Sequence, residues 1–187
     1  MGSTATDTDH GSYNTFIGRG SGYSNTTGYK NTASGVSSLY FNTEGYKNTA
    51  NGLASLFSNT TGYNNIANGL ASLFDLTEGF QNTAIGFNTG RGITTGDNNT
   101  ILGANVDGLD ANLSNNIIIA DGAGNRRINV DSSGNVGIGT TNPEADLEVI
   151  GLIRTSPVFT SGYIHAFEDQ ATLTNVGGYS SYDTLLL

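Results

Sequence analysis

A strict 17-residue period runs through most of this chain. Its clearest marker is an asparagine that recurs seven times with no insertion or deletion between copies, at Asn14, Asn31, Asn48, Asn65, Asn82, Asn99 and Asn116. A small residue, nearly always glycine, follows each copy four places later. Disordered polar segments do not keep register over such a length, whereas stacked structural repeats do. The period therefore predicts a repeat fold.

The repeat unit favours strands over helices. It is too short for a pair of helices and too rich in glycine for a stable helix. Its consensus, N-T-A-x-G-x-x-S-L-aromatic-x-N-T-x-G-Y-x, contains two short segments that we interpret as strands. The sequence thus predicts an all-β fold, with a β-solenoid (β-roll) of about seven 17-residue coils over residues 14–120. The seven asparagines would form a structural ladder at corners where asparagine tolerates left-handed backbone geometry.

Two aromatic columns do not fit the thin interior that alanine and leucine columns would fill. They are Tyr40, Phe57 and Phe74, and Tyr29, Tyr46, Tyr63 and Phe80. On the outside they would form contiguous apolar stripes, which monomers rarely expose. Such a stripe could stack on sugars, but burial between subunits is favoured, so we expect an oligomer of parallel rods.

The regions outside the repeat have a different organisation. Residues 1–13 are interpreted as a leader, either disordered or vector-derived. Residues 121–155 are predicted to be a β-meander connector, with strands near 116–120, 126–130 and 135–139. Thr141 to Glu144 have the pattern of a one-turn helix start, and a strand is expected from Leu147. Residues 156–187 are predicted to be a C-terminal module, and we expect the natural chain to continue beyond it.

Composition excludes several classes of function. Sixteen acidic residues oppose seven basic ones, for a formal net charge of −9, so a nucleic-acid partner is not expected. The chain has no cysteine, which excludes disulfides and thiolate chemistry. It has no run of 18 apolar residues, so membrane insertion is not expected.

Catalysis is not expected either. The only histidines are His10, in the leader, and His165, which we interpret as structural or surface-exposed. Carboxylate pairs of the kind that glycosidases use occur as Asp75 with Glu78, Asp107 with Asp110, and Glu168 with Asp169. The first pair occupies columns filled by unrelated residues in neighbouring coils, which indicates exposed positions. Glycan hydrolysis is therefore a lesser alternative.

Two further patterns in the sequence bear on metal binding and on ice binding. Asp97, Asp107, Asp110, Asp121 and Asp131 form a run of oxygen ligands, but its spacing matches no calcium loop, and ordinary turn chemistry explains it better. We expect no metal or cofactor. Ice binding is suggested by a threonine column, Thr15, Thr32, Thr49, Thr83 and Thr100. Ile66 interrupts that column, and β-branched residues stack well between strands for structural reasons alone, so this is another lesser alternative.

Several motifs resemble those of trimeric fibre proteins. N-T-F-I-G at 14–18, N-T-A-I-G at 82–86 and N-T-I-L-G at 99–103 resemble the head repeats of trimeric autotransporter adhesins. The fuller repeat resembles repeats in bacteriophage tail fibres and in fibre adhesins of bacteria, including predatory ones. The segment 135–149 is similar to the connector that precedes a fibre tip and a self-cleaving intramolecular chaperone, although the chaperone itself is absent here. The resemblance implies a homotrimer on a virion tail or cell surface.

The function expected from this resemblance is attachment to another cell. The receptor would be a cell-surface glycan or an outer-membrane component. Candidate contact residues lie in the C-terminal module and are Tyr163, His165, Phe167, Tyr179 and Tyr182. Aromatic side chains stack on sugar faces, although burial in a trimer core is an alternative for the same residues. The alternative function is that of a structural spacer whose receptor-binding tip lies elsewhere.

Overall fold

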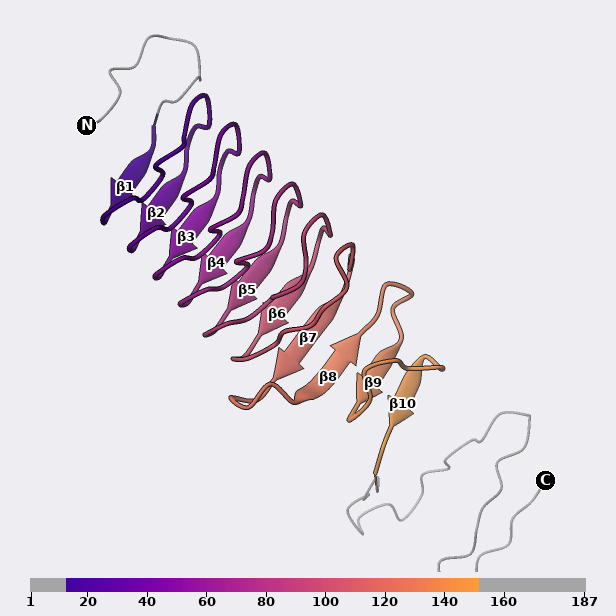
Figure 1. The fold of residues 1–187 in the computed structure, drawn as a ribbon. Helices are drawn as coiled ribbons and strands as arrows, with labels where there is room; N and C mark the ends of the chain where they lie inside the picture. The colour runs from indigo at the N-terminus through magenta and orange to yellow at the C-terminus, as the bar shows by residue number, and fades with distance from the viewer. Residues whose placement is uncertain (1–12, 152–187) are drawn as a thin grey trace, which may run out of the picture. The chain divides into compact units, whose positions relative to one another are not determined.

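A computed structural model describes residues 13–151 of the chain, and within that range the regular structure consists of ten strands in one sheet. The first seven are β1 (Thr15–Ile17), β2 (Thr32–Ser34), β3 (Thr49–Asn51), β4 (Ile66–Asn68), β5 (Thr83–Ile85), β6 (Thr100–Leu102) and β7 (Ile117–Ala120). The last three are β8 (Arg126–Val130), β9 (Val136–Ile138) and β10 (Leu147–Val149). The strands lie side by side in sequence order (Figure 1).

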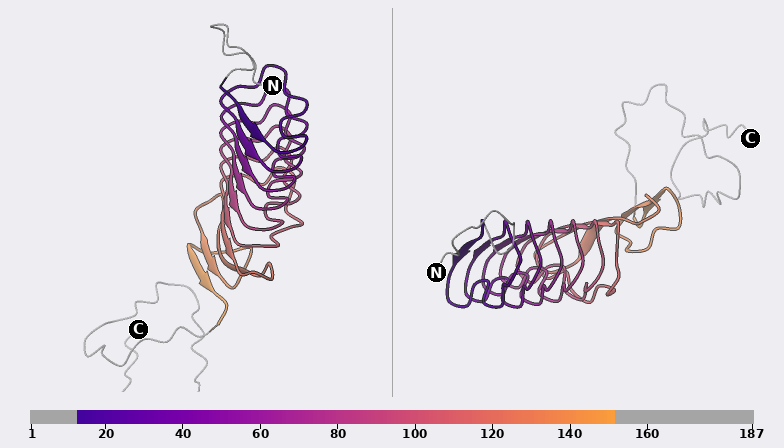
Figure 2. Two further views of the ribbon diagram at one scale, coloured as in Figure 1. Left: turned by 90° about the vertical axis from the view of Figure 1, so that its left-hand side faces the viewer. Right: turned by 90° about the horizontal axis from the view of Figure 1, so that it is seen from above.

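Strands β1 to β7 confirm the predicted solenoid and its period. Each pairs in parallel with the next, and every residue pairs with the residue 17 positions later: Thr32 with Thr49, and Thr49 with Ile66. The chain makes about six turns between β1 and β7, and successive turns stack as open loops (Figure 2). The seven ladder asparagines therefore form a single file, each directly before a strand.

The core is as thin as the sequence predicts. The middle residue of each of the strands β1 to β6 points inward, and Ala33, Ala50, Ala67 and Ala84 are fully buried. Leu39, Leu56 and Leu73 close the interior from the opposite side of the coil and are also fully buried. Glycine is required where coils touch: a Cβ on Gly52, whose φ is 129°, would lie 2.6 Å from the carbonyl oxygen of Gly69.

The second predicted strand of each unit is absent. The S-L-aromatic segment forms turns, and residues such as Ser37 and Leu39 have φ angles of 57° and 49°, whereas a strand needs strongly negative φ. The backbone still bonds to the next coil, since Leu39 N donates to Ser55 O at 3.0 Å. The alternating left-handed residues allow the neighbours Ser38 and Leu39 both to be buried, whereas neighbouring side chains of an extended segment point to opposite faces.

The position of the left-handed residue at each corner also differs from the prediction. The ladder asparagines were expected to have positive φ, and they do not. The residue immediately before each ladder asparagine has the left-handed conformation instead, with φ between 54° and 61°; these residues are Tyr13, Lys30, Lys47, Asn64, Gln81, Asn98 and Asn115. This arrangement leaves the asparagine side chain free to face inward and bond to the backbone of the next coil.

Beyond β7 the sheet changes direction. Strands β7, β8 and β9 are antiparallel neighbours, close to the predicted ranges, but β10 pairs in parallel with β9, so the last connection is a crossover and not a meander turn. The expected helix start at 141–144 is not helical. Because β10 runs parallel to β9, the segment between them must return the chain along the length of β9, which a helix start at this point would not do. Within this segment, Glu144 N donates to Glu148 Oε2 at 2.9 Å.

Contacts divide the chain into two units, Met1–Leu152 and Ile153–Leu187. All described residues belong to the first.

Candidate functional site

The asparagine ladder is satisfied within the fold. From Asn14 to Asn99, each Oδ1 accepts a hydrogen bond from the backbone N–H of the next ladder asparagine at 2.8–3.1 Å. From Asn14 to Asn99, each Nδ2 donates to a backbone carbonyl 14 positions later at 2.6–2.8 Å. The internal copies are almost fully buried. With donors and acceptors paired inside the protein, this column has a structural role.

A second, shorter amide ladder lies on the other side of the coil. The Nδ2 of Asn42 donates to Oδ1 of Asn25, and the Nδ2 of Asn59 donates to Oδ1 of Asn42, both at 2.7 Å. The column continues with Leu76, which cannot donate. Oδ1 of Asn59 is consequently buried and has no hydrogen-bond partner among the described residues.

The first aromatic column forms a continuous ring stack on the outside of the coils. It begins with Tyr23, so it is longer than the sequence predicts. Ring centroids are 4.9 Å apart for Tyr23–Tyr40, 5.4 Å for Tyr40–Phe57 and 4.8 Å for Phe57–Phe74. Arg91 follows in the same column, with its guanidinium 4.6 Å from the Phe74 ring centre and its Nε 2.7 Å from Asp75 Oδ2. The stack thus ends in a cation–π contact between Arg91 and Phe74, and the ion pair with Asp75 holds the guanidinium in place.

The second ring stack is more regular. The rings of neighbouring coils are nearly parallel and stack face to face with centroid spacings of 4.8–4.9 Å, in the order Tyr29, Tyr46, Tyr63 and Phe80. Burial, followed by the neighbouring Tyr63 and Tyr29, raises the pKa of the Tyr46 hydroxyl. Lys30 and Lys47 lie over the Tyr29 and Tyr46 rings at 5.3 and 5.6 Å.

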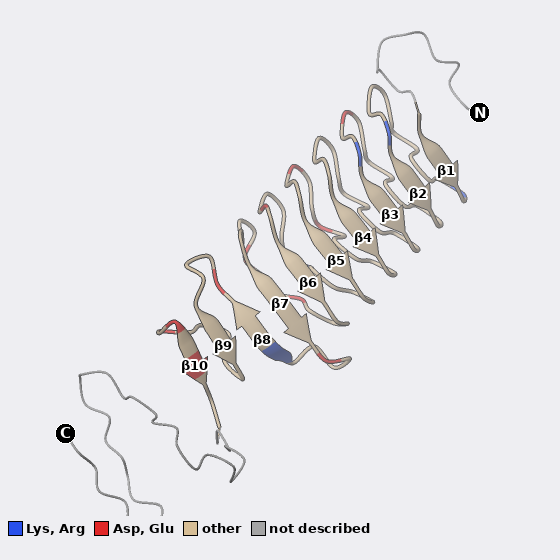
Figure 3. Ribbon diagram, turned by 180° about the vertical axis from the view of Figure 1, so that it is seen from behind, with Lys and Arg blue, Asp and Glu red and all other residues tan. Residues whose placement is uncertain are grey.

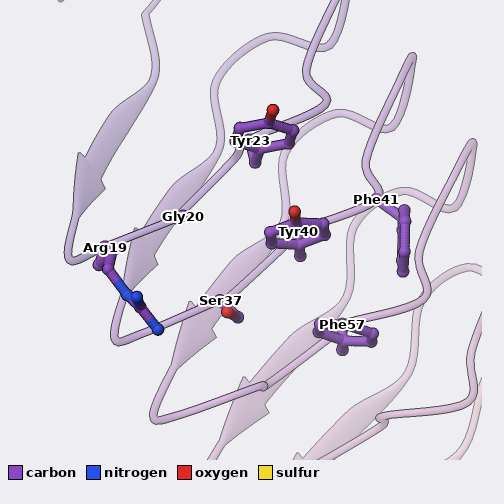
Figure 4. A pocket seen from close by; sticks show the side chains of 7 residues that line it. All are labelled: Arg19, Gly20, Tyr23, Ser37, Tyr40, Phe41 and Phe57. Atoms are coloured by element: carbon purple, nitrogen blue, oxygen red, sulfur yellow. The ribbon is translucent and has the colours of Figure 1, made fainter.

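A surface groove of about 610 Å³ opens along the N-terminal part of the first stack. Figure 4 shows the rings of Tyr23, Tyr40 and Phe57 in a row, with Arg19 and Ser37 on one side and Phe41 on the other. The Phe41 ring stands at 80° and 81° to its two neighbours in the stack. The groove is lined by Arg19, Gly20, Tyr23, Ser37, Tyr40, Phe41 and Phe57.

The outer face of the sheet carries no charge from β1 to β7 (Figure 3). The outward strand positions are threonine, serine or asparagine in β2 and β3, and become mainly aliphatic from β4 onward. Exposed apolar residues on this face and just beyond the strand ends are Ile17, Val36, Leu53, Ile66, Leu70, Ile85, Phe87, Leu102, Ile117 and Ile119. We call this set the uncharged sheet face. It runs across several coils.

Charged groups gather instead around β8. Asp121 Oδ1 accepts from the backbone of Ala123 and Asn125, and Arg127 Nε donates to Asp121 Oδ2 at 3.0 Å. The Asn125 amide and then Arg127 lower the pKa of Asp121 from 3.8 to about 2. Burial lowers the pKa of the half-buried Arg126, which lines a polar hollow of about 600 Å³ with Thr141.

The candidate receptor contacts of the C-terminal module lie outside the described residues; they are Tyr163, His165, Phe167, Tyr179 and Tyr182. Asp75, a candidate carboxylate, is engaged by Arg91 and by Gly92 N at 3.0 Å. Within residues 13–151, no three His, Cys, Asp or Glu side chains gather to hold a metal ion. The same range contains no helix of sufficient length and hydropathy to cross a bilayer.

The sequence prediction missed the groove, because it gives no role to Arg19, Tyr23 or Phe41. A comparison of columns could have found it. The ring column carries hydroxyls only in its first two coils, and the position of Arg19 is filled by Val36 and Leu53 in the next coils.

The chain matches no protein-family model, no curated protein sequence and no solved structure.

Proposed function

We propose that this chain is a segment of a fibre-type attachment protein, which assembles as a homotrimer and binds a glycan or outer-membrane component on the surface of a target cell. The segment would stand on a virion tail or on a cell surface. The uncharged sheet face is the observation that carries the assembly part of this proposal. The resemblance of the repeats to trimeric fibre proteins supplies the attachment part.

The sheet face suits contact between copies of one chain. Leu53 and Phe87 are 49% and 50% exposed, and single copies of a protein rarely leave so extended an apolar surface in water. The chain carries a net charge of −9, so like-charged copies repel one another. Contact through the strand positions of β1 to β7, none of which is charged, brings apolar side chains together and keeps the acidic loops apart.

Sedimentation velocity of the full chain tests the assembly. We expect a trimer for the wild type and a smaller species for the Ile85→Lys/Leu102→Lys double variant, because each lysine would be buried unpaired at the interface. Gln81→Lys is the matched charge control: Gln81 is exposed, and its column already holds Lys30 and Lys47. Circular dichroism of all three proteins reports whether the β-structure persists. A monomeric wild type would contradict the proposal.

Cell binding tests the attachment. Labelled full chain is incubated with a panel of Gram-negative cells before and after periodate oxidation, which destroys vicinal diols of sugars. Binding that periodate abolishes identifies a glycan receptor, and binding that only protease treatment abolishes identifies an outer-membrane protein. Absence of binding to every cell type tested would favour the spacer function instead. The fully satisfied asparagine ladder, which stiffens a stack without needing a ligand, is the observation that supports a spacer.

A further inference from the structure

The groove beside the first ring stack departs from the repeat pattern at several columns at once. Arg19 stands where the following coils have Val36, Leu53 and Leu70. Ser37 and Gly20 stand where later coils have Ala54 and Ala71, and Phe41 stands where they have Ser58 and Asp75. These departures all fall on one hollow that a ligand could enter.

Two of these exceptions keep the groove open and polar. A Cβ at Gly20 would lie 3.2 Å from Cε2 of Tyr40, so glycine leaves room along the ring edge. Tyr23 and Tyr40 carry hydroxyls, whereas the next two rings in the column are Phe57 and Phe74. The first coils thus offer hydroxyls beside ring surfaces, and the later coils offer only apolar ones.

The groove also holds a positive charge without a counter-charge. Within residues 13–151, Arg19 forms no ion pair, although the chain is acidic overall. Guanidinium groups bind carboxylates in a bidentate manner. Tyr23 ends the described ring stack and is 71% exposed, and Phe41 is 46% exposed, so both offer ring surface to a ligand. A ligand that matches all of these groups has a carboxylate, several hydroxyls and an apolar C–H face.

We infer that this groove binds a carboxylated pyranose within an acidic saccharide. Arg19 holds the carboxylate, the Tyr40 and Ser37 hydroxyls bond to ring hydroxyls, and the exposed rings of Tyr23 and Phe41 contact the C–H face of the sugar. The inference rests on the proposed attachment function and deepens it, because it names the receptor chemistry and places the contact on the shaft. Uronic acids and sialic acids share this chemistry.

Titration calorimetry with the full chain tests the groove. The probes are a trigalacturonate, its neutral methyl ester, and sialyllactose. Arg19→Val introduces the residue that the next coil has at this position, so the fold is expected to persist. We expect Arg19→Val to weaken binding of the acidic probe by about tenfold or more. Lys47→Asn is the matched control, since it removes one positive charge elsewhere and takes the residue of the next coil; it should change binding by less than about twofold.

The outcomes separate this inference from the proposed function. Binding of trigalacturonate alone or of sialyllactose alone identifies the sugar class. Failure of both acidic probes to bind the wild type overturns the inference, and so does equal weakening by Arg19→Val and Lys47→Asn, or equal binding of the methyl ester. If wild type and Arg19→Val adhere to cells equally, the groove is not the contact and attachment stands. If saccharide binding depends on Arg19 but no cell is bound, the groove stands and attachment does not.

Discussion

Asn59 donates a hydrogen bond from its side-chain amide to Oδ1 of Asn42 across 2.7 Å, one coil away. The corresponding bond from the next coil to Oδ1 of Asn59 is missing, because the next residue in the column is Leu76, which has no side-chain donor. The short ladder therefore ends in a buried acceptor without a donor, and such an atom costs about 1–3 kcal/mol.

This orphaned acceptor leads to a prediction about the two asparagines. Asn59→Leu removes one unpaired Oδ1 and creates another on Asn42, and it adds apolar volume that Leu76 already shows to be compatible with the column. Asn42→Leu leaves Oδ1 of Asn59 without a donor and also removes the donor to Oδ1 of Asn25. We expect Asn42→Leu to lower the free energy of unfolding by about 1–2 kcal/mol more than Asn59→Leu. Urea unfolding followed by circular dichroism measures the difference, and equal costs would contradict this account.

The long ladder should be far less tolerant. Asn65 is fully buried, accepts from Asn82 N at 3.0 Å and donates to Gly79 O at 2.8 Å. Asn65→Ala leaves both backbone groups without these partners, so we expect a loss of about 3 kcal/mol or more in the free energy of unfolding. Asn68→Ala, an exposed site in β4, is the control and should stay within about 0.5 kcal/mol. A small effect at Asn65 would mean that water replaces the ladder.

Asp121 should make the turn before β8 sensitive to acid. Its pKa is lowered from 3.8 to about 2, so its ionised form is favoured by folding. The resulting stabilisation is present above the unfolded pKa and is lost as the pH falls from 3.8 toward about 2. Carboxyl NMR titration should show the lowered pKa, and Asn125→Ala should raise it more than Arg127→Gln does. Asn112→Ala, an exposed asparagine outside this turn, should leave it unchanged.

Tyr46 should respond to its neighbours in the second ring stack. Its pKa is raised chiefly by burial and then by Tyr63 and Tyr29. Because the folded pKa lies above the unfolded one, the associated stability is present below the unfolded pKa and is lost as the pH rises through the folded pKa. Tyr63→Phe, which repeats the Phe80 of the next coil, should lower the pKa of Tyr46 without returning it fully to its ordinary value. Tyr23→Phe, in the other stack, should have no effect in a titration of tyrosine absorbance.

The repeat period carried most of the fold prediction because side-chain columns follow directly from it. Once the asparagines are placed in one file, the buried Ala33 and Leu39 columns and the outer aromatic columns follow without any knowledge of the backbone. The turn geometry does not follow. Ser37 and Leu39 have ordinary strand-compatible side chains, and nothing in their identity indicates positive φ. The same holds for Lys30, which occupies the left-handed corner in place of the expected asparagine.

The candidate site shows a different limit. The aromatic columns were placed correctly on the outside, since rings of that size cannot fit beside alanine in a thin core. The groove depends on how Phe41 stands perpendicular to Tyr40, at a centroid distance of 4.9 Å, and on the space at Gly20. These relations depend on the particular residues of the first coils, which a consensus averages away. Attention to the exceptions in each column would have pointed to Arg19.

In-register pairing has a consequence for how such a chain can vary. Every coil contacts only the coils before and after it, through the same 17-residue offset. Duplication or loss of one whole repeat would therefore lengthen or shorten the stack by one ring spacing, 4.8 Å in the Phe57–Phe74 pair, and leave the contacts of the other coils intact. Insertion of a partial repeat would instead move asparagine out of its file in every later coil. Changes in the reach of this protein are thus confined to whole-repeat steps.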